Sequence, residues 1–113
     1  MSSSIDWAWL AGLFEGEGCF LFTNVNSVGL AIESTDQDIL ARVQSIAGGT
    51  LNGPYAFESK IGKKPTWRWT LHQATSVAVA LQRLKPHLGQ RRLERLEEAQ
   101  ARLVNCRGRR GRA

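Results

Sequence analysis

The sequence has few of the residues that form disulfide bonds or bind transition metals. Its 113 residues include two cysteines, Cys19 and Cys106, and two histidines, with no CxxC pair and no Cys/His cluster. These counts exclude a disulfide framework and a structural zinc site. Apolar runs stay far below the ~18–20 residues that cross a bilayer, and residues 1–18 contain no Lys or Arg, unlike a secretory signal. We expect no membrane partner and a reducing compartment.

Lys and Arg are sparse in the first 82 residues and gather toward the C-terminus. Residues 83–113 hold ten Lys and Arg against three acids, a net charge of +7, whereas residues 1–82 hold five against seven, a net charge of −2. A cationic segment beside a slightly acidic body suits a phosphate-bearing partner, although a solvated basic tail explains the charge equally well. The length suits one domain. We expect a single domain over residues 1–104 and a basic flexible tail over residues 105–113.

The periodicity of the apolar residues predicts an α+β fold in the order αββαββα, followed by one more helix after Pro86. The expected helices cover about residues 4–17, 35–48, 75–84 and 91–104, and the expected strands cover 19–23, 28–33, 50–58 and 67–72. Expected N-caps are Ser4, Thr35 with Asp38, and Thr75 or Ser76, and the first helix is expected to end in a left-handed glycine at Gly16 or Gly18.

The strands come as two hairpins, so the four-stranded sheet should be antiparallel, with helices on one face. In residues 67–72, Trp67, Trp69 and Leu71 alternate with Arg68, Thr70 and His72. Because successive strand residues point to opposite faces, the first set should meet the helices and the second set should face outward. The outward face is either free to bind a ligand or simply solvated.

The first helix carries a stripe of small residues. Ala8, Gly12 and Gly16 recur every fourth residue and therefore lie on one side of the helix. Each glycine costs about 1 kcal/mol of helix stability relative to alanine, so a compensating contact is expected. Small residues let two backbones approach closely. We expect a second helix to pack on this stripe, and the alternative is close packing of the helix on its own sheet.

Residues 10–18, with the sequence Leu-Ala-Gly-Leu-Phe-Glu-Gly-Glu-Gly, resemble the signature nonapeptide of the LAGLIDADG homing endonucleases. Phe14 replaces isoleucine, Glu15 and Glu17 replace the two aspartates, and Gly16 replaces alanine. The resemblance continues through residues 32–40, Gly48–Gly49 and residues 84–92, and it spans about residues 5–100. It implies a four-stranded antiparallel saddle-shaped sheet with helices on one face.

The resemblance also implies an activity. Family members with one motif form homodimers that cut both strands of a long pseudo-palindromic DNA site by metal-assisted phosphodiester hydrolysis. On this reading the partners are double-stranded DNA and a second copy of the chain. The cofactor is Mg²⁺ or another divalent cation, such as Mn²⁺, or Ca²⁺ without turnover. The family is typically encoded in mobile introns or by free-standing genes in phages, bacteria and organelles. The resemblance therefore implies the cytoplasm, for a bacterial or phage-encoded protein, or an organelle.

Individual roles follow from the positions that match. Glu17 is implied as the metal carboxylate and catalytic residue, with the Gly16 carbonyl as a second metal ligand. Arg91 matches a basic catalytic position that is usually lysine, so only its electrostatic role carries over. The implied dimer interface consists of Ala8, Gly12, Glu15 and Gly16, with Glu15 in a structural role.

The outward face of the sheet should read DNA bases in the major groove. Arg68 is the best candidate for a contact to guanine, whereas Lys60, Lys63 and Lys64 are expected to contact phosphates. Glu33 lies on the same face, and its negative charge would repel phosphate. The full set of expected DNA-binding residues is Thr23, Asn24, Asn26, Asn52, Lys60, Lys63, Lys64, Arg68 and Thr70.

Two other readings stay open. The chain could be a cleavage-inactive nucleic-acid-binding protein of the same fold, either an intron RNA maturase or a transcription regulator, which makes intron RNA an alternative partner. It could also be a small structural domain with a basic tail. The presence of both Glu15 and Glu17 favours the nuclease, and the small-residue stripe argues against the structural domain.

Overall fold

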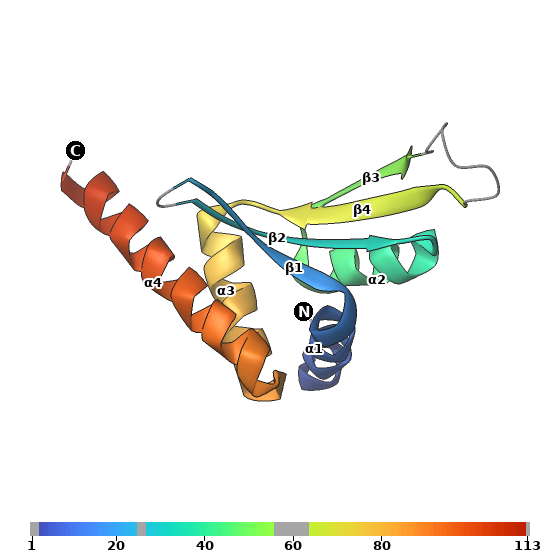
Figure 1. Ribbon diagram of the computed structural model, residues 1–113, viewed down its shortest axis with the longest axis horizontal. Coiled ribbons are helices and arrows are strands. Elements are labelled where there is room, and N and C mark those ends of the chain that lie inside the picture. Colours follow the sequence, from blue (N-terminus) through green and yellow to red (C-terminus); the bar gives the residue numbers. More distant parts are fainter. Residues whose placement is uncertain (1–2, 25–26, 56–63, 113) are drawn as a thin grey trace.

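A computed structural model of the protein describes residues 3–24, 27–55 and 64–112, without the side chains of residues 23, 24 and 105–112. Within these residues the helices lie on one side of a four-stranded sheet (Figure 1). The helices are α1 (Ser4–Glu17), α2 (Gln37–Ala47), α3 (Ala74–Leu84), the short 3-10 helix η1 (Lys85–His87) and α4 (Gln90–Arg112). The strands are β1 (Gly18–Asn24), β2 (Ser27–Ser34), β3 (Thr50–Tyr55) and β4 (Thr66–Leu71).

The sheet is antiparallel throughout, with the strand order β1-β2-β4-β3. One row of directly paired residues crosses all four strands, from Cys19 through Ala31 and Thr70 to Thr50. The two hairpins therefore meet along β2 and β4. This topology confirms the predicted α+β fold and the single layer of helices.

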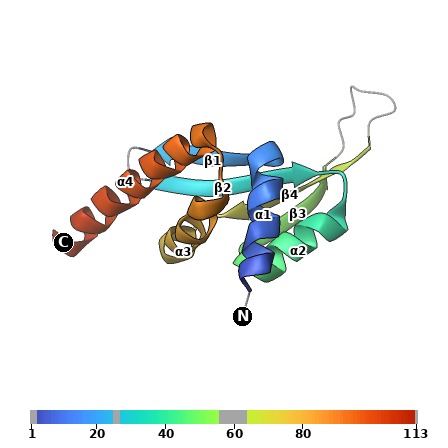
Figure 2. The ribbon, with the colours of Figure 1, turned by 90° about the horizontal axis from the view of Figure 1, so that it is seen from below.

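The core lies between the sheet and the helices. Figure 2 shows α1 crossing the covered face, with α2 on one side and α3 and α4 on the other. The alternation predicted for β4 is confirmed, because Trp69 and Leu71 are buried while Arg68 and His72 lie on the other face. Burying large apolar side chains contributes about 1.5–3 kcal/mol each. The largest fully buried side chains are Trp69, Phe14, Leu10, Leu30, Ile32, Leu40, Leu81, Leu84 and Leu96.

Helix α4 packs against the hairpin of β1 and β2 through apolar and cation–π contacts. Leu96, Ala99 and Leu103 are buried, and the guanidinium groups of Arg95 and Arg102 lie 4.6 and 4.3 Å from the centre of the Phe22 ring. Such cation–π contacts hold the apolar stems of the arginines on the hairpin. Part of the predicted cationic segment is therefore used within the protein.

The end of α4 differs from the prediction. The helix was expected to stop near residue 104, but its backbone continues as helix to Arg112. The backbone of four arginines therefore belongs to α4, but their side chains are not among those described. These are Arg107, Arg109, Arg110 and Arg112. The predicted flexibility of residues 105–113 stays a prediction.

The predicted start of α1 was one residue late. Ser3, rather than Ser4, is the N-cap: its hydroxyl accepts from the Asp6 backbone N–H at 3.2 Å, and the Asp6 carboxylate accepts from the Ser3 N–H at 3.0 Å. This reciprocal pair is a capping box. Because three serines stand in a row, only the spacing to Asp6 distinguishes the capping serine.

The predicted caps of the next two helices were also wrong. Asp36, rather than Thr35, precedes α2, and Gln73 precedes α3, so α3 begins before Thr75. Neither Asp36 nor Gln73 makes a side-chain cap hydrogen bond. Ser76 instead donates to the Gln73 side chain at 3.1 Å.

The predicted left-handed end of α1 is absent. Gly18 has φ −79° and ψ 160°, so the chain passes directly from helix into extended strand. A glycine is required there because a Cβ would overlap the Phe14 ring. Gly48, by contrast, has φ 80° and ends α2 at the predicted position.

Across the described residues, no helix combines the length and apolar character needed to cross a membrane.

Candidate nucleic-acid interface

Glu17 is the last residue of α1, and its side chain is exposed. It borders two neighbouring hollows. The first has a volume of about 360 Å³ and is lined by Glu17, Cys19, Ala31, Glu33 and Arg68. The second has a volume of about 540 Å³ and is lined by Glu17, Leu13, Glu33, Ser34, Thr35, Asp36, Ile39 and Thr66. The Glu17 carboxylate therefore stands where the end of α1 meets the open face of the sheet.

The surroundings of Glu17 suit a hard cation but do not complete a site for one. A carboxylate at the C-terminal end of a helix adds its charge to the negative end of the helix dipole. Within the described part of the chain, no group of three His, Cys, Asp or Glu residues could hold a metal ion. Mg²⁺ prefers about six oxygen ligands. A cation bound by Glu17 therefore needs further oxygen atoms from water, from a phosphate or from a second copy.

Glu15 has a different environment from Glu17, although only Gly16 separates them. Its carboxylate accepts a hydrogen bond from the backbone N–H of Gly89 and lies 3.8 Å from the Arg92 Nε atom. The Glu15 backbone carbonyl also accepts from that Nε at 3.3 Å. Glu15 thus ties the end of α1 to the beginning of α4, which agrees with the structural role that the family resemblance implies.

Arg91, the predicted catalytic arginine, is exposed in the first turn of α4. It lines neither hollow beside Glu17. Sequence reasoning missed Arg92 and Gly89, whose contacts to Glu15 cross 77 and 74 residues of chain. The sequence alone does not distinguish Arg91 from its neighbour Arg92. Arg92 points toward α1 because of its position on the turn of α4.

The stripe of small residues on α1 faces outward. Ala8, Gly12 and Gly16 are exposed, and Ile5 on the same side is 76% exposed. A Cβ added at Gly12 or at Gly16 would meet nothing within 4 Å. The opposite side of α1 supplies the buried residues Trp7, Leu10, Ala11 and Phe14. The alternative that the stripe packs on its own sheet is therefore wrong.

The open face of the sheet carries part of the predicted DNA-binding set. Arg68 stands between Asn52 on β3 and Glu33 on β2, since it pairs directly with both. Thr70 occupies the next row on the same face of β4 and is partly exposed. Lys64 is exposed just before β4. These four predicted residues, Asn52, Lys64, Arg68 and Thr70, therefore lie on or beside one surface.

The remaining predicted DNA-binding residues cannot be placed on that surface. Asn26, Lys60 and Lys63 lie outside the described residues, and only the backbone of Thr23 and Asn24 is described. Their roles stay predictions.

Comparisons with known proteins bear on the fold of this chain. No protein-family model matches the sequence, and no curated protein matches it. Solved structures do match. The homing endonuclease I-CvuI in complex with the I-CreI target shares 23% identity, with 87% of this chain and 66% of that chain covered and a TM-score of 0.63. The chain has the LAGLIDADG homing-endonuclease fold.

Two further structures show how completely the homing-endonuclease fold covers this chain. The intron-encoded homing endonuclease I-CeuI, complexed with DNA, covers 96% of it at 15% identity and a TM-score of 0.72. The LAGLIDADG meganuclease I-AabMI, bound to uncleaved DNA, covers 96% at 16% identity and a TM-score of 0.73. This chain spans 58% of I-CeuI and 39% of I-AabMI. The resemblance read from residues 10–18 is confirmed in the fold.

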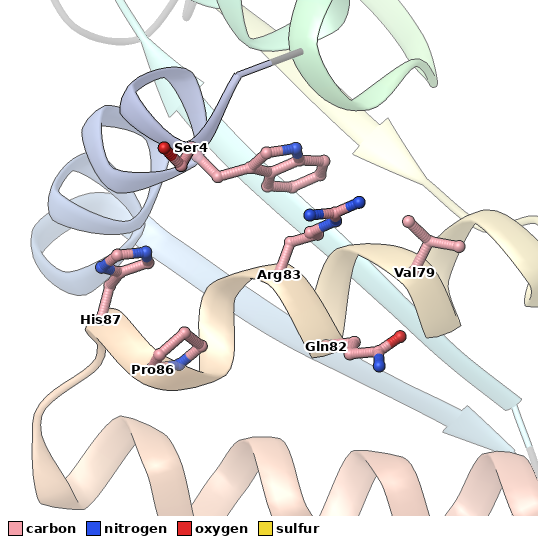
Figure 3. Close-up of a pocket in the computed structure, with 7 residues that line it drawn as sticks. Ser4, Val79, Gln82, Arg83, Pro86 and His87 are labelled. Carbon is pink, nitrogen blue, oxygen red and sulfur yellow. The ribbon is translucent and has the colours of Figure 1, made fainter. Parts of the chain in front are cut away.

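A third hollow lies on the side of the homing-endonuclease fold away from the open face. Figure 3 shows it between the start of α1 and the end of α3, with a volume of about 520 Å³. None of the predicted site residues borders this hollow. Arg83, the charged residue in its lining, is exposed. Its lining residues are Ser4, Trp7, Val79, Gln82, Arg83, Pro86 and His87.

Proposed function

We propose that this chain is one half of a homodimeric, site-specific DNA endonuclease of the LAGLIDADG family, which makes a double-strand break by metal-assisted hydrolysis. The observation that carries the proposal is the position of Glu17. Its exposed carboxylate borders a hollow on the open face of the sheet and ends the helix whose outer side is uncovered. A metal carboxylate, a DNA-reading face and a dimer contact can therefore meet at one point.

The dimer is supported by the character of α1. Helices that are apolar on all sides are normally buried on all sides, and α1 carries charge only at Asp6, Glu15 and Glu17. Its outer side, with Ile5, Ala8 and Gly12, has room for a second backbone. A second copy suits this side, because a two-fold axis along the stripe would also bring a second Glu17 to the same centre.

The metal requirement follows from that pairing. Two carboxylates brought close repel each other, and bound divalent cations relieve the repulsion. The Glu17 carboxylate and the Gly16 carbonyl would hold the ion together with oxygen atoms of the partner and of the DNA. When bound, Mg²⁺ would polarise the scissile phosphate and activate water.

The chain's other residues would position the DNA around this centre. Arg91, exposed at the start of α4, would stabilise negative charge that develops on the phosphate. Glu15 and Arg92 would fix the start of α4 against α1 and so set the distance between Arg91 and Glu17. Lys64 would contact the phosphate backbone, and Arg68, Asn52 and Thr70 would face the bases.

Selection of cleaved sites from a random duplex DNA library, with Mg²⁺ present, tests the proposal. We expect recovery of one long pseudo-palindromic site, cut on both strands. The Glu17→Gln variant should bind that site and leave it uncut, because the amide is a poorer ligand for Mg²⁺. Cleavage by this variant at the wild-type rate would contradict the metal role. Selective binding without cleavage by the wild type would instead identify a cleavage-inactive binding protein of the same fold.

A further inference from the structure

Glu33 and Arg68 form an ion pair on the open face of the sheet. They are direct cross-strand partners on β2 and β4, and the Arg68 Nη1 atom donates to the Glu33 Oε1 atom at 3.2 Å. Their side chains are 57% and 40% exposed. The sequence indicated that Glu33 would oppose phosphate, but it did not indicate that Arg68 has a partner, because the two residues are 35 positions apart.

This pair is a poor contact for a phosphate. A guanidinium beside a carboxylate has little net charge, and the carboxylate repels phosphate oxygens. The pair is better suited to the edge of a base pair, which is polar but uncharged. The guanidinium has five N–H donors, of which the contact with Glu33 uses one, and the carboxylate has two acceptor oxygens.

The chemistry of the pair matches one base pair. In the major groove, guanine presents the acceptors O6 and N7, and its partner cytosine presents the N4 amino donor. Arg68 offers donors and Glu33 offers an acceptor beside them. Arg68 is fixed on β4 and Glu33 on β2, so the donor and the acceptor cannot exchange places. The pair would therefore distinguish G·C from C·G as well as from A·T.

The position of the pair indicates which base pair it would contact. Glu33 and Arg68 line the same hollow as Glu17. A base pair contacted there lies near the cleavage centre rather than at the outer end of the half-site. Asn52, the other cross-strand neighbour of Arg68, would lie farther from that centre, since β3 is the edge strand away from β1.

We propose that Glu33 and Arg68 act as one unit that reads a single G·C base pair beside the cleavage centre in each half-site. Arg68 donates to the guanine and Glu33 accepts from the cytosine amino group. Glu33 is also a positioning residue, because its carboxylate holds the guanidinium of Arg68. The inference rests on the proposed function in requiring sequence-selective DNA binding, but it does not require cleavage.

The test is binding-site selection with Ca²⁺, followed by measured affinities for sites changed one base pair at a time. The proteins are the wild type, Glu33→Ala, Glu33→Gln, Arg68→Ala and the Glu33→Ala/Arg68→Ala double variant. Lys64→Ala is the matched control for loss of a charge beside the same face. Glu33 is exposed and Arg68 is partly exposed, so their replacement should leave the fold intact, as circular dichroism would verify.

We expect the wild type to prefer G·C at one symmetric position by at least about fivefold. Glu33→Ala and Arg68→Ala should each abolish that preference, and the double variant should lose no more than Arg68→Ala alone. Glu33→Gln should retain part of it, because the amide oxygen still accepts. Lys64→Ala should lower affinity for all sites alike.

An unchanged preference in Glu33→Ala would overturn the inference, and so would additive losses in the double variant. In either case the selective binding by the wild type would leave the proposed function standing. A wild-type protein with no sequence-selective DNA binding would overturn the proposed function, and the inference with it.

Discussion

The two sides of α1 have opposite surroundings. The inner side packs Trp7, Leu10 and Phe14 against the sheet and the other helices. The outer side presents Gly12 and Gly16. Among the described residues, and apart from the adjoining helix backbone, no atom lies within 4 Å of a Cβ added at either position. A stripe of glycines with no contact inside the chain lowers helix stability without compensation. The inner side therefore serves the fold, whereas the outer side is left uncovered and is the surface on which the proposed dimer would form.

Two glycines in and after this helix differ in the same way. Gly18 must be glycine for the fold, because a Cβ would overlap the Phe14 ring. Gly12 has no such requirement within one chain. Substitutions on the inner side should therefore change the free energy of unfolding, and substitutions on the outer side should change the association of two chains.

The largest expected effect is on the inner side. Phe14→Ala should lower the free energy of unfolding by about 3–5 kcal/mol, because it removes a fully buried ring and leaves a cavity. Phe14 also packs edge-on against Phe20, with 5.0 Å between the ring centres. Urea denaturation followed by circular dichroism measures the change. A loss below about 1 kcal/mol would show that the inner side of α1 is not the core contact described.

The next largest effect is on the outer side. Gly12→Leu should leave the fold of each chain intact and weaken its dimer roughly thirtyfold or more, since each copy inserts a side chain into a close helix contact. Sedimentation equilibrium measures the association. Ala41→Leu, which adds the same side chain at an exposed position of α2, is the matched control. A dimer unaffected by Gly12→Leu would contradict the outer-side assignment.

A smaller effect is expected where α1 meets α4. Glu15→Ala should lower the free energy of unfolding by about 1 kcal/mol, because it removes the acceptor for Gly89 and the ion pair with Arg92. Cleavage should fall as well, since the start of α4 carries Arg91. Glu94→Ala, an exposed acid on α4, is a suitable control in thermal unfolding. Equal effects of the two substitutions would show that Glu15 does not anchor α4.

The sequence predicted the fold well where periodicity decides it. Alternation in residues 67–72 predicted the two faces of β4, and the order of hairpins and helices predicted the antiparallel sheet. Helix starts were predicted poorly, because residues 2–4 and 34–36 offer several polar residues that could each serve as a cap. The length of α4 was missed because its last turns have no apolar residue after Cys106.

The candidate site was predicted in part. Glu17 and the stripe could be predicted because both lie within one short segment, residues 8–17. Their roles in metal binding and dimer formation stay predictions. The partners of Glu15 and Arg68 were not predictable, because they depend on how α4 docks and on the pairing of β2 with β4. Such contacts join residues far apart in the chain, and no local pattern encodes them.

The central claim is that the outer side of α1 pairs with the same side of a second copy. Oxidative cross-linking of Gly12→Cys, in a chain that also carries Cys19→Ser and Cys106→Ser, tests it most directly. A disulfide forms only when two Cα atoms come within about 4.4–6.8 Å. We expect Gly12→Cys to give a covalent dimer on a non-reducing gel, and Ala41→Cys in the same background to give little of it. A Gly12→Cys chain that cross-links no better than Ala41→Cys would contradict it.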